Sequence, residues 1–200
     1  MSRVFYAFTV LVAGLALVGA GCGPEGQNNN NPPPEDNNEN DAVYAGWQSY
    51  TNNDSGYAVK YPADFSLSEG VLTPTGFGNF PAVKIVIPER FFTGTNLGND
   101  SGIFVYQSCM LEGTQDATAV MIQQGENRFI EFKISRGEAG HFYDTSLLST
   151  QAGTGCYNLM LFLHSLNAEA SAPGEVVTQF DRKALTDILY KVAGSLTILN

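Results

Sequence analysis

Hydrophobic and polar residues follow three different patterns along the chain. Residues 4–18 form an uncharged apolar run directly after Arg3. Residues 23–41 carry no aliphatic or aromatic side chain apart from their prolines. From Tyr44 onward, aromatic and β-branched residues alternate with polar ones. The first pattern is typical of a secretory signal peptide, the second of a disordered segment and the third of a folded domain rich in strands.

The third region predicts a sheet. In residues 56–61, Tyr57, Val59 and Tyr61 share one face, which is the alternation of a half-buried strand. Further strands are predicted over residues 82–87, 103–109, 118–123, 128–135, 147–151 and 156–165. The last of these is apolar on both faces for much of its length, which predicts a central place in the sheet. The intervening Gly125-Glu126-Asn127 predicts a hairpin turn.

One helix is predicted near the C-terminal end. Apolar residues recur at helical spacing from Ala184 to Leu196, and Asp181 is an N-cap candidate. Gly194 and Ser195 end the helix, and residues 196–199 predict a short terminal strand. We expect the apolar stripe of the helix to pack on the sheet.

Residues 56–65, GYAVKYPADF, resemble the opening of a PsbP-like domain, whose pattern is Gly-aromatic-x-apolar-x-Tyr-Pro-x-x-aromatic. Thinner similarity follows at residues 95–97, 156–157 and 164–165, and in the C-terminal helix with the residues after it. Phe65 departs from the pattern, since tryptophan is common there. The resemblance is to uncharacterised bacterial lipoproteins with a PsbP-like domain. It implies an α+β fold, with a central antiparallel sheet and packing helices, that serves as an accessory or binding module, although fold alone does not fix function.

The start of the chain predicts export. The small residues Gly19, Ala20 and Gly21 precede Cys22, and this segment resembles a bacterial lipobox, in which the cysteine is acylated and becomes the first mature residue. The usual leucine three residues before the cysteine is replaced by Gly19. The alternative is cleavage after Ala20, which leaves Cys22 as a free thiol. Gly23, by analogy with Gram-negative lipoproteins, favours sorting to the outer membrane.

These patterns divide the chain into a signal peptide at residues 1–21, an acidic Asn/Pro-rich tether at residues 22–43 and a PsbP-like α+β domain at residues 44–200. The tether lacks the apolar surface needed to offset the entropy of ordering, so we expect a spacer. The formal net charge of -10 repels phosphate backbones, which argues against a nucleic-acid partner. The expected partners are a membrane, through the lipid anchor, and an envelope protein.

Two cysteines are left once Cys22 is assigned to a lipid. An even pair in an exported domain predicts a disulfide between Cys109 and Cys156. The alternative makes Cys156 a nucleophile with His141 or His164 as its base. The residues around Cys156 resemble no known nucleophile motif.

Candidate sites for other chemistry are few. His141 lies in a predicted loop and His164 at the end of an apolar strand, and two histidines alone do not complete a zinc site, so no metal is expected. The sequence has no Gly-x-Ser-x-Gly elbow and no phosphate-binding glycine loop, and we expect no cofactor. A binding surface would use aromatic residues whose alternative place is the core: Trp47, Phe77, Phe80, Phe91 and Phe92.

The leading hypothesis is therefore a non-catalytic, lipid-anchored module that binds or stabilises another component of the bacterial envelope. The first alternative is a hydrolase acting on envelope glycans or peptides, which requires a histidine–carboxylate pair or clustered carboxylates in a cleft. The second is a small-molecule or cation-binding lipoprotein. The ligand stays unassigned in all three.

Overall fold

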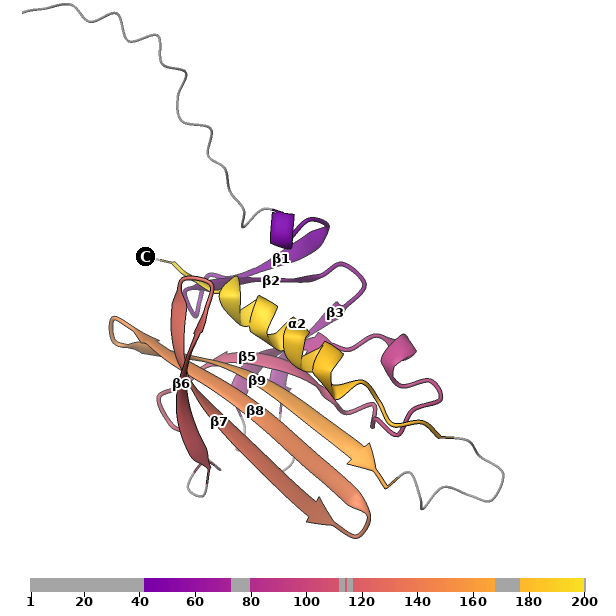
Figure 1. Cartoon of the computed structure of the whole chain (residues 1–200). Coiled ribbons are helices and arrows are strands. Elements are labelled where there is room, and N and C mark those ends of the chain that lie inside the picture. Colours follow the sequence, from indigo (N-terminus) through magenta and orange to yellow (C-terminus); the bar gives the residue numbers. More distant parts are fainter. Residues whose placement is uncertain (1–41, 73–79, 112–113, 115–116, 168–176, 200) are drawn as a thin grey trace, which may run out of the picture. The chain divides into compact units, whose positions relative to one another are not determined.

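A computed structural model describes residues 42–72, 80–111, 114, 117–167 and 177–199. These residues belong to one compact unit, residues 39–200 (Figure 1). The predicted signal peptide, Cys22, nearly all of the predicted tether and Phe77 lie outside the described residues. Those assignments stay predictions.

Most of the described strands belong to one antiparallel sheet. Its members are β3 (Ser66–Leu72), β4 (Phe80–Val86), β5 (Gly102–Gln107), β6 (Thr118–Gln124), β7 (Asn127–Glu138), β8 (His141–Ala152) and β9 (Gly155–Leu166). Their order is β3-β4-β5-β9-β8-β7-β6. The strand β9 lies in the middle, as its apolar faces predicted. Its residues 157–163 are all buried because both edges are hydrogen-bonded and both faces are covered.

A second, three-stranded antiparallel sheet has the order β1-β2-β10. It is made of β1 (Trp47–Asn52), β2 (Tyr57–Pro62) and β10 (Thr197–Ile198). The helix α2 (Arg182–Gly194) lies across the seven-stranded sheet and contacts both β6 and β9, as well as β2 in the other sheet (Figure 1). Asp181 caps it, since its side chain accepts a hydrogen bond from the Ala184 amide at 2.9 Å.

The larger core lies between α2 and the two sheets. Leu185, Leu189 and Val192 of the helix are fully buried there, against Tyr57 and Val59 of β2 and the α2-facing residues of β9. A smaller core covers the opposite face of the seven-stranded sheet. It contains Phe104, Tyr106, Leu147, Met160 and Phe162.

The expected α+β class, a central antiparallel sheet with packing helices, is wrong. The described residues are mostly β and form two antiparallel sheets, with α2 as their one helix longer than a single turn. The described ranges also contain a 3-10 turn at Glu89–Phe91 and two helical residues, Ala42 and Val43. The family resemblance implied more than one packing helix, whereas the hydrophobic spacing predicted a single helix near the C-terminal end. Over the residues it describes, the structure has the single helix that the spacing predicted.

The strands differ from prediction mainly in length. The strands β7, β8 and β9 each run for twelve residues, whereas shorter segments were predicted. His141 is consequently the first residue of β8 and not part of a loop. The strands β1 and β3 were not predicted, because their side chains do not alternate cleanly between buried and exposed.

Candidate functional site

Both histidines of the chain meet on the face of the seven-stranded sheet that α2 does not cover. His141 at the start of β8 pairs with Leu166, two residues beyond His164 of β9, so the two histidines lie diagonally on the same face. The Nδ1 atom of His141 is 2.7 Å from Nε2 of His164. The Nδ1 atom of His164 is in turn 2.8 Å from Oδ1 of Asp100. The three side chains form one hydrogen-bonded line, which we call the histidine chain.

Asp100 reaches the histidines because the chain bulges outward just before β5. The β5–β9 ladder reaches the pair Gly102↔Phe162, and pairing resumes only at Leu97↔Ser165. The residues between these two pairs form a turn. Ser101 fixes this bulge: its hydroxyl accepts a hydrogen bond from the His164 amide at 3.0 Å.

Gly98 leaves room for the His164 ring. A Cβ atom at this position would come within 2.7 Å of His164 Nδ1, where the ring meets Asp100. The Gly98 amide also donates to the His164 carbonyl at 2.7 Å. The bulge therefore holds both the backbone and the ring of His164.

The protonation pattern of the histidine chain follows from hydrogen-bonding capacity. An ionised Asp100 only accepts, so His164 must donate through Nδ1. A neutral His164 then accepts at Nε2, and His141 must donate through its own Nδ1. The Nε2 atom of His141 is thus left unprotonated and able to accept a proton.

Neighbouring side chains hold the histidine chain in place. Tyr143 stacks on the His164 ring, with centroids 4.7 Å apart. Lys84 donates from Nζ to the Asp100 backbone carbonyl at 2.8 Å and lies over Phe104. Burial lowers the pKa of Lys84, while the charge of Asp100 opposes this change. A fixed, partly desolvated polar cluster of this kind suits either structural anchoring or proton transfer.

The α2 face of the sheet carries two adjoining cavities beside the first turn of the helix. One, of about 210 Å³, has Lys133, Ser135, Ser146 and Thr186 in its lining. The other, of about 440 Å³, has Phe142, Ser165, Gln179 and Phe180 in its lining. Asp144 and Arg182 line both. We call the two cavities together the α2 groove.

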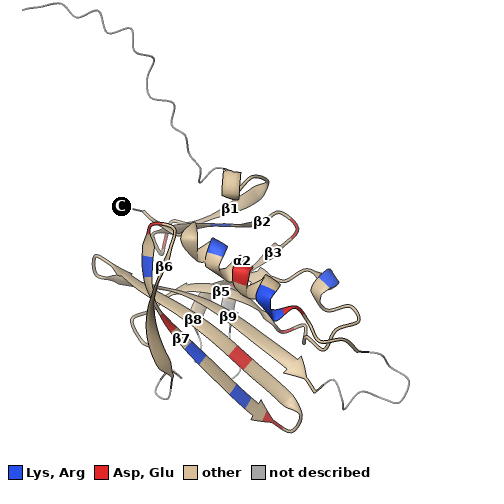
Figure 2. Cartoon of the chain, in the orientation of Figure 1, with Lys and Arg blue, Asp and Glu red and all other residues tan. Residues whose placement is uncertain are grey.

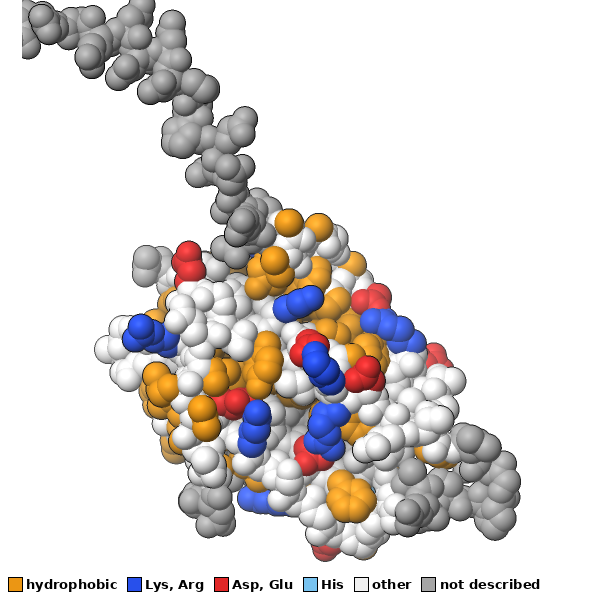
Figure 3. Space-filling view, viewed as in Figure 1, with side chains coloured by type: hydrophobic (Ala, Val, Ile, Leu, Met, Phe, Trp, Pro, Cys, Tyr) orange, Lys and Arg blue, Asp and Glu red, His pale blue; other side chains and the backbone are white. Residues whose placement is uncertain are grey.

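An ion pair divides the α2 groove. The Arg182 guanidinium donates to Asp144 Oδ2 at 2.7 Å, and Ser135 donates to Asp144 Oδ1 at 2.6 Å. Arg182 also lies over the Phe180 ring, 5.4 Å from its centroid. Acidic and basic residues are interspersed over β7, β8 and the start of α2 (Figure 2), and side chains of both signs lie next to apolar ones on this surface (Figure 3).

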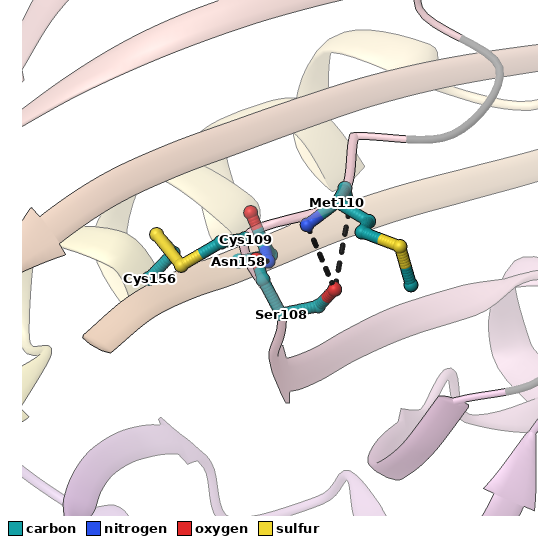
Figure 4. Close-up of a disulfide and its surroundings, with 5 residues drawn as sticks. All are labelled: Ser108, Cys109, Met110, Cys156 and Asn158. Atoms are coloured by element: carbon teal, nitrogen blue, oxygen red, sulfur yellow. Dashed lines mark hydrogen bonds between the residues drawn. A yellow bond between two sulfur atoms is a disulfide. The ribbon is translucent and has the colours of Figure 1, made fainter. Parts of the chain in front are cut away.

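Cys109 and Cys156 form the predicted disulfide (Figure 4). Cys109 follows β5, and Cys156 is the second residue of β9, so the bridge closes the end of a hydrogen-bonded strand pair. This pairing excludes the alternative in which Cys156 is a free nucleophile. Beneath the bridge, the buried Asn158 donates to the Ser108 carbonyl at 2.7 Å. Its Oδ1 atom has no hydrogen-bond partner in the described part of the chain.

The aromatic residues predicted as binding candidates pack against the core wherever their side chains are described. Trp47, Phe91 and Phe92 are half-buried against the larger core. The side chain of Phe80 is not described, and Phe77 lies outside the described residues. Sequence reasoning missed Phe142, which is 46% exposed at the α2 groove. Its only signal was its place beside His141.

No group of three or more His, Cys, Asp or Glu side chains within the described ranges is arranged to hold a metal ion. No helix within them is both long and apolar enough to cross a membrane.

No family model matches the chain, and no curated protein does. A solved structure from Bacteroides thetaiotaomicron VPI-5482 matches with a TM-score of 0.45 and 13% identity, over 78% of this chain and 49% of that one. This chain therefore spans about half the length of that protein.

A second match is the solution structure of the cyanobacterial PsbP protein CyanoP from Synechocystis sp. PCC 6803. The TM-score is 0.39 at 15% identity, over 77% of this chain and 93% of that one. Because both TM-scores are below 0.5, neither likeness carries an argument about function.

Proposed function

We propose that this chain is a non-catalytic binding module of the bacterial envelope, exported and anchored through a lipid on Cys22. The disulfide between Cys109 and Cys156 is the observation that carries the proposal. Disulfides form and persist in exported proteins and are rare in the cytosol. The bridge also uses both remaining cysteines, so Cys22 is the one thiol left for acylation, directly after the small residues of the lipobox-like segment.

The α2 groove supports the binding half of the proposal. It combines half-exposed aromatic surface with converging polar groups, which is the usual composition of a ligand site. A groove beside the first turn of a capped helix is also held rigidly, because Asp181 fixes that turn.

Expression of the full chain in a Gram-negative host tests the anchor. We expect the wild type to partition into the detergent phase of Triton X-114 and to incorporate a labelled fatty acid. Cys22→Ala should lose both properties, whereas a Cys109→Ala, Cys156→Ala double variant should keep them. A wild-type protein that carries no lipid would refute the anchor.

The partner is tested separately. Crosslinking in intact membranes followed by affinity capture should recover an envelope component with the wild type. Recovery of this chain alone would count against the binding module.

A hydrolase is the second candidate, and the histidine chain favours it. Asp100 orients the His164 imidazole, and Nε2 of His164 accepts a hydrogen bond from Nδ1 of His141. This arrangement leaves His141 Nε2 as a proton acceptor. This function predicts turnover of envelope glycans or peptides by the wild type, with the loss of that turnover in His141→Gln. Equal and negligible turnover by the wild type and His141→Gln would exclude the hydrolase function.

A further inference from the structure

The larger cavity of the α2 groove has features that select a ligand. Its volume of about 440 Å³ falls within the range of small-molecule sites, about 300–1,000 Å³. It opens beside Phe142, which is 46% exposed although large aromatic side chains usually bury more of their surface. It lies at the paired ends of β8 and β9, in front of the segment that leads into α2.

Ser165 is the informative residue of this cavity. It is only 4% exposed, lies opposite Phe142 in the β8–β9 ladder and lines the cavity. Because Ser165 lines the cavity, its hydroxyl can both donate to and accept from a ligand there.

The charges of the cavity cancel. Asp144 and Arg182 are its two charged lining residues, and they pair at 2.7 Å. An anionic or cationic ligand would have to compete with this pair. A neutral polar ligand can instead accept from the free N–H groups of Arg182 and donate to Asp144, without breaking the pair.

The remaining wall is fixed and also polar. Asn96 joins the two sides of the cavity, because it donates to the Leu166 carbonyl at 2.7 Å and accepts from the Phe180 amide at 3.1 Å. Gln179 is exposed at the rim and offers both a donor and an acceptor. A purely apolar ligand would offer no hydrogen-bond partner to Gln179 or Ser165.

We infer that the α2 groove binds a neutral saccharide unit, with the C–H face of the sugar on Phe142 and its hydroxyl groups on Ser165, Gln179 and the Asp144–Arg182 pair. This inference rests on the proposed binding function and names its ligand class. A sugar ring presents an apolar face together with several hydroxyl groups that each donate and accept. The cavity presents the matching combination.

Saturation-transfer NMR on the full chain in detergent micelles tests the inference. The probes are glucose, N-acetylglucosamine and cellobiose, with the dipeptide alanyl-alanine as a zwitterionic comparison. At least one saccharide should give a saturable signal. Phe142→Ala and Ser165→Ala should each weaken binding about tenfold, the change that corresponds to about 1.4 kcal/mol. The matched control is Met121→Ala, which removes a side chain 65% exposed on β6, outside the cavity lining, and should leave binding unchanged.

Three results would overturn the inference: no saturable binding of any saccharide, binding of the dipeptide alone, or equal weakening in all three variants. Far-ultraviolet circular dichroism identifies a variant that fails to fold. If Ser165→Ala were to unfold the protein, the exposed Phe142→Ala would still decide the outcome. Because the assay requires neither the lipid nor an envelope partner, its failure is distinguishable from failure of the proposed anchor.

Discussion

Gly125, in the turn between β6 and β7, lies directly against the backbone of Gly194 at the end of α2. A Cβ atom on Gly125 would come within 2.7 Å of the Gly194 carbonyl oxygen. Two residues further on, the Asn127 side chain donates to the Leu196 carbonyl at 2.8 Å. The β6–β7 hairpin thus closes over the C-terminal end of the helix, where backbone carbonyls lack helical partners.

Gly125→Ala should destabilise the domain by more than backbone strain alone. Gly125 has a φ of +58°, and Gly153 has the same φ with nothing within 4 Å of a Cβ atom. Gly153→Ala should therefore lower the free energy of unfolding only by the strain of a left-handed backbone, about 1–2 kcal/mol. Gly125→Ala adds a backbone overlap and should cost about 1–3 kcal/mol more. Urea unfolding measures both variants, and equal losses would contradict the close packing.

Loss of the disulfide should lower the free energy of unfolding by about 4 kcal/mol, the chain-entropy value for this loop. The bridge joins residues separated by 47 positions. The Cys109→Ala, Cys156→Ala double variant should show this loss in urea unfolding, and the wild type in reductant should behave like it. Cys22→Ala, which leaves the bridge intact, is the control and should unfold like the wild type. Indistinguishable midpoints for all these proteins would argue against the bridge.

Tyr190→Phe should destabilise the domain by about 2 kcal/mol, because it leaves a buried carboxylate without one donor. The Tyr190 hydroxyl donates to Glu131 Oε1 at 2.7 Å, and Glu131 is only 5% exposed. Tyr44→Phe is the matched control. It removes an exposed hydrogen bond to the Lys191 carbonyl, and should cost about 1 kcal/mol or less. Thermal unfolding compares the two, and a smaller effect at Tyr190 would contradict the assignment.

The domain should lose stability above about pH 10. Burial raises the pKa of Tyr57 and of Tyr190 above the ordinary value of 10.0, and for Tyr190 the hydrogen bond and the charge of Glu131 raise it further. The unfolded chain therefore releases these protons at a lower pH than the folded one. The stabilisation that these two tyrosines contribute is complete below their pKa in the unfolded chain. It is lost as the pH rises through their pKa in the folded protein. Unfolding in urea at increasing alkaline pH should show this decline, less steeply in Tyr190→Phe.

Both neutral imidazoles should be Nδ1–H tautomers. This follows from the order Asp100, His164, His141, in which the carboxylate can only accept. Long-range 1H–15N correlation spectra of the full chain distinguish the two ring nitrogens of each histidine. Asp100→Ala should remove the constraint and allow the Nε2–H form at His164. An Nε2–H tautomer at His164 in the wild type would contradict the hydrogen-bonded line.

Local features could be predicted from the sequence because neighbouring residues produce them. The helix cap depends on Asp181, whose side chain accepts a hydrogen bond from the amide three residues further on. The β6–β7 turn depends on Gly125. The alternation of Tyr57, Val59 and Tyr61 determines which face of β2 is buried. The disulfide could also be predicted, because the domain has only two cysteines and they allow only one pairing.

The tertiary structure alone decided which strands lie side by side and where the polar residues meet. His141 and His164 are 23 positions apart, and Asp100 is a further 64 from His164, yet the register of β8 on β9 and the bulge before β5 bring them into line. Phe142 and Ser165 share the α2 groove for the same reason. Strand order and register arise from packing across the whole core, which one segment of sequence does not encode. The sequence by itself therefore determined the strand-rich character, the capped helix, the turn and the cysteine pairing, whereas the histidine chain and the groove exist only in the folded sheet.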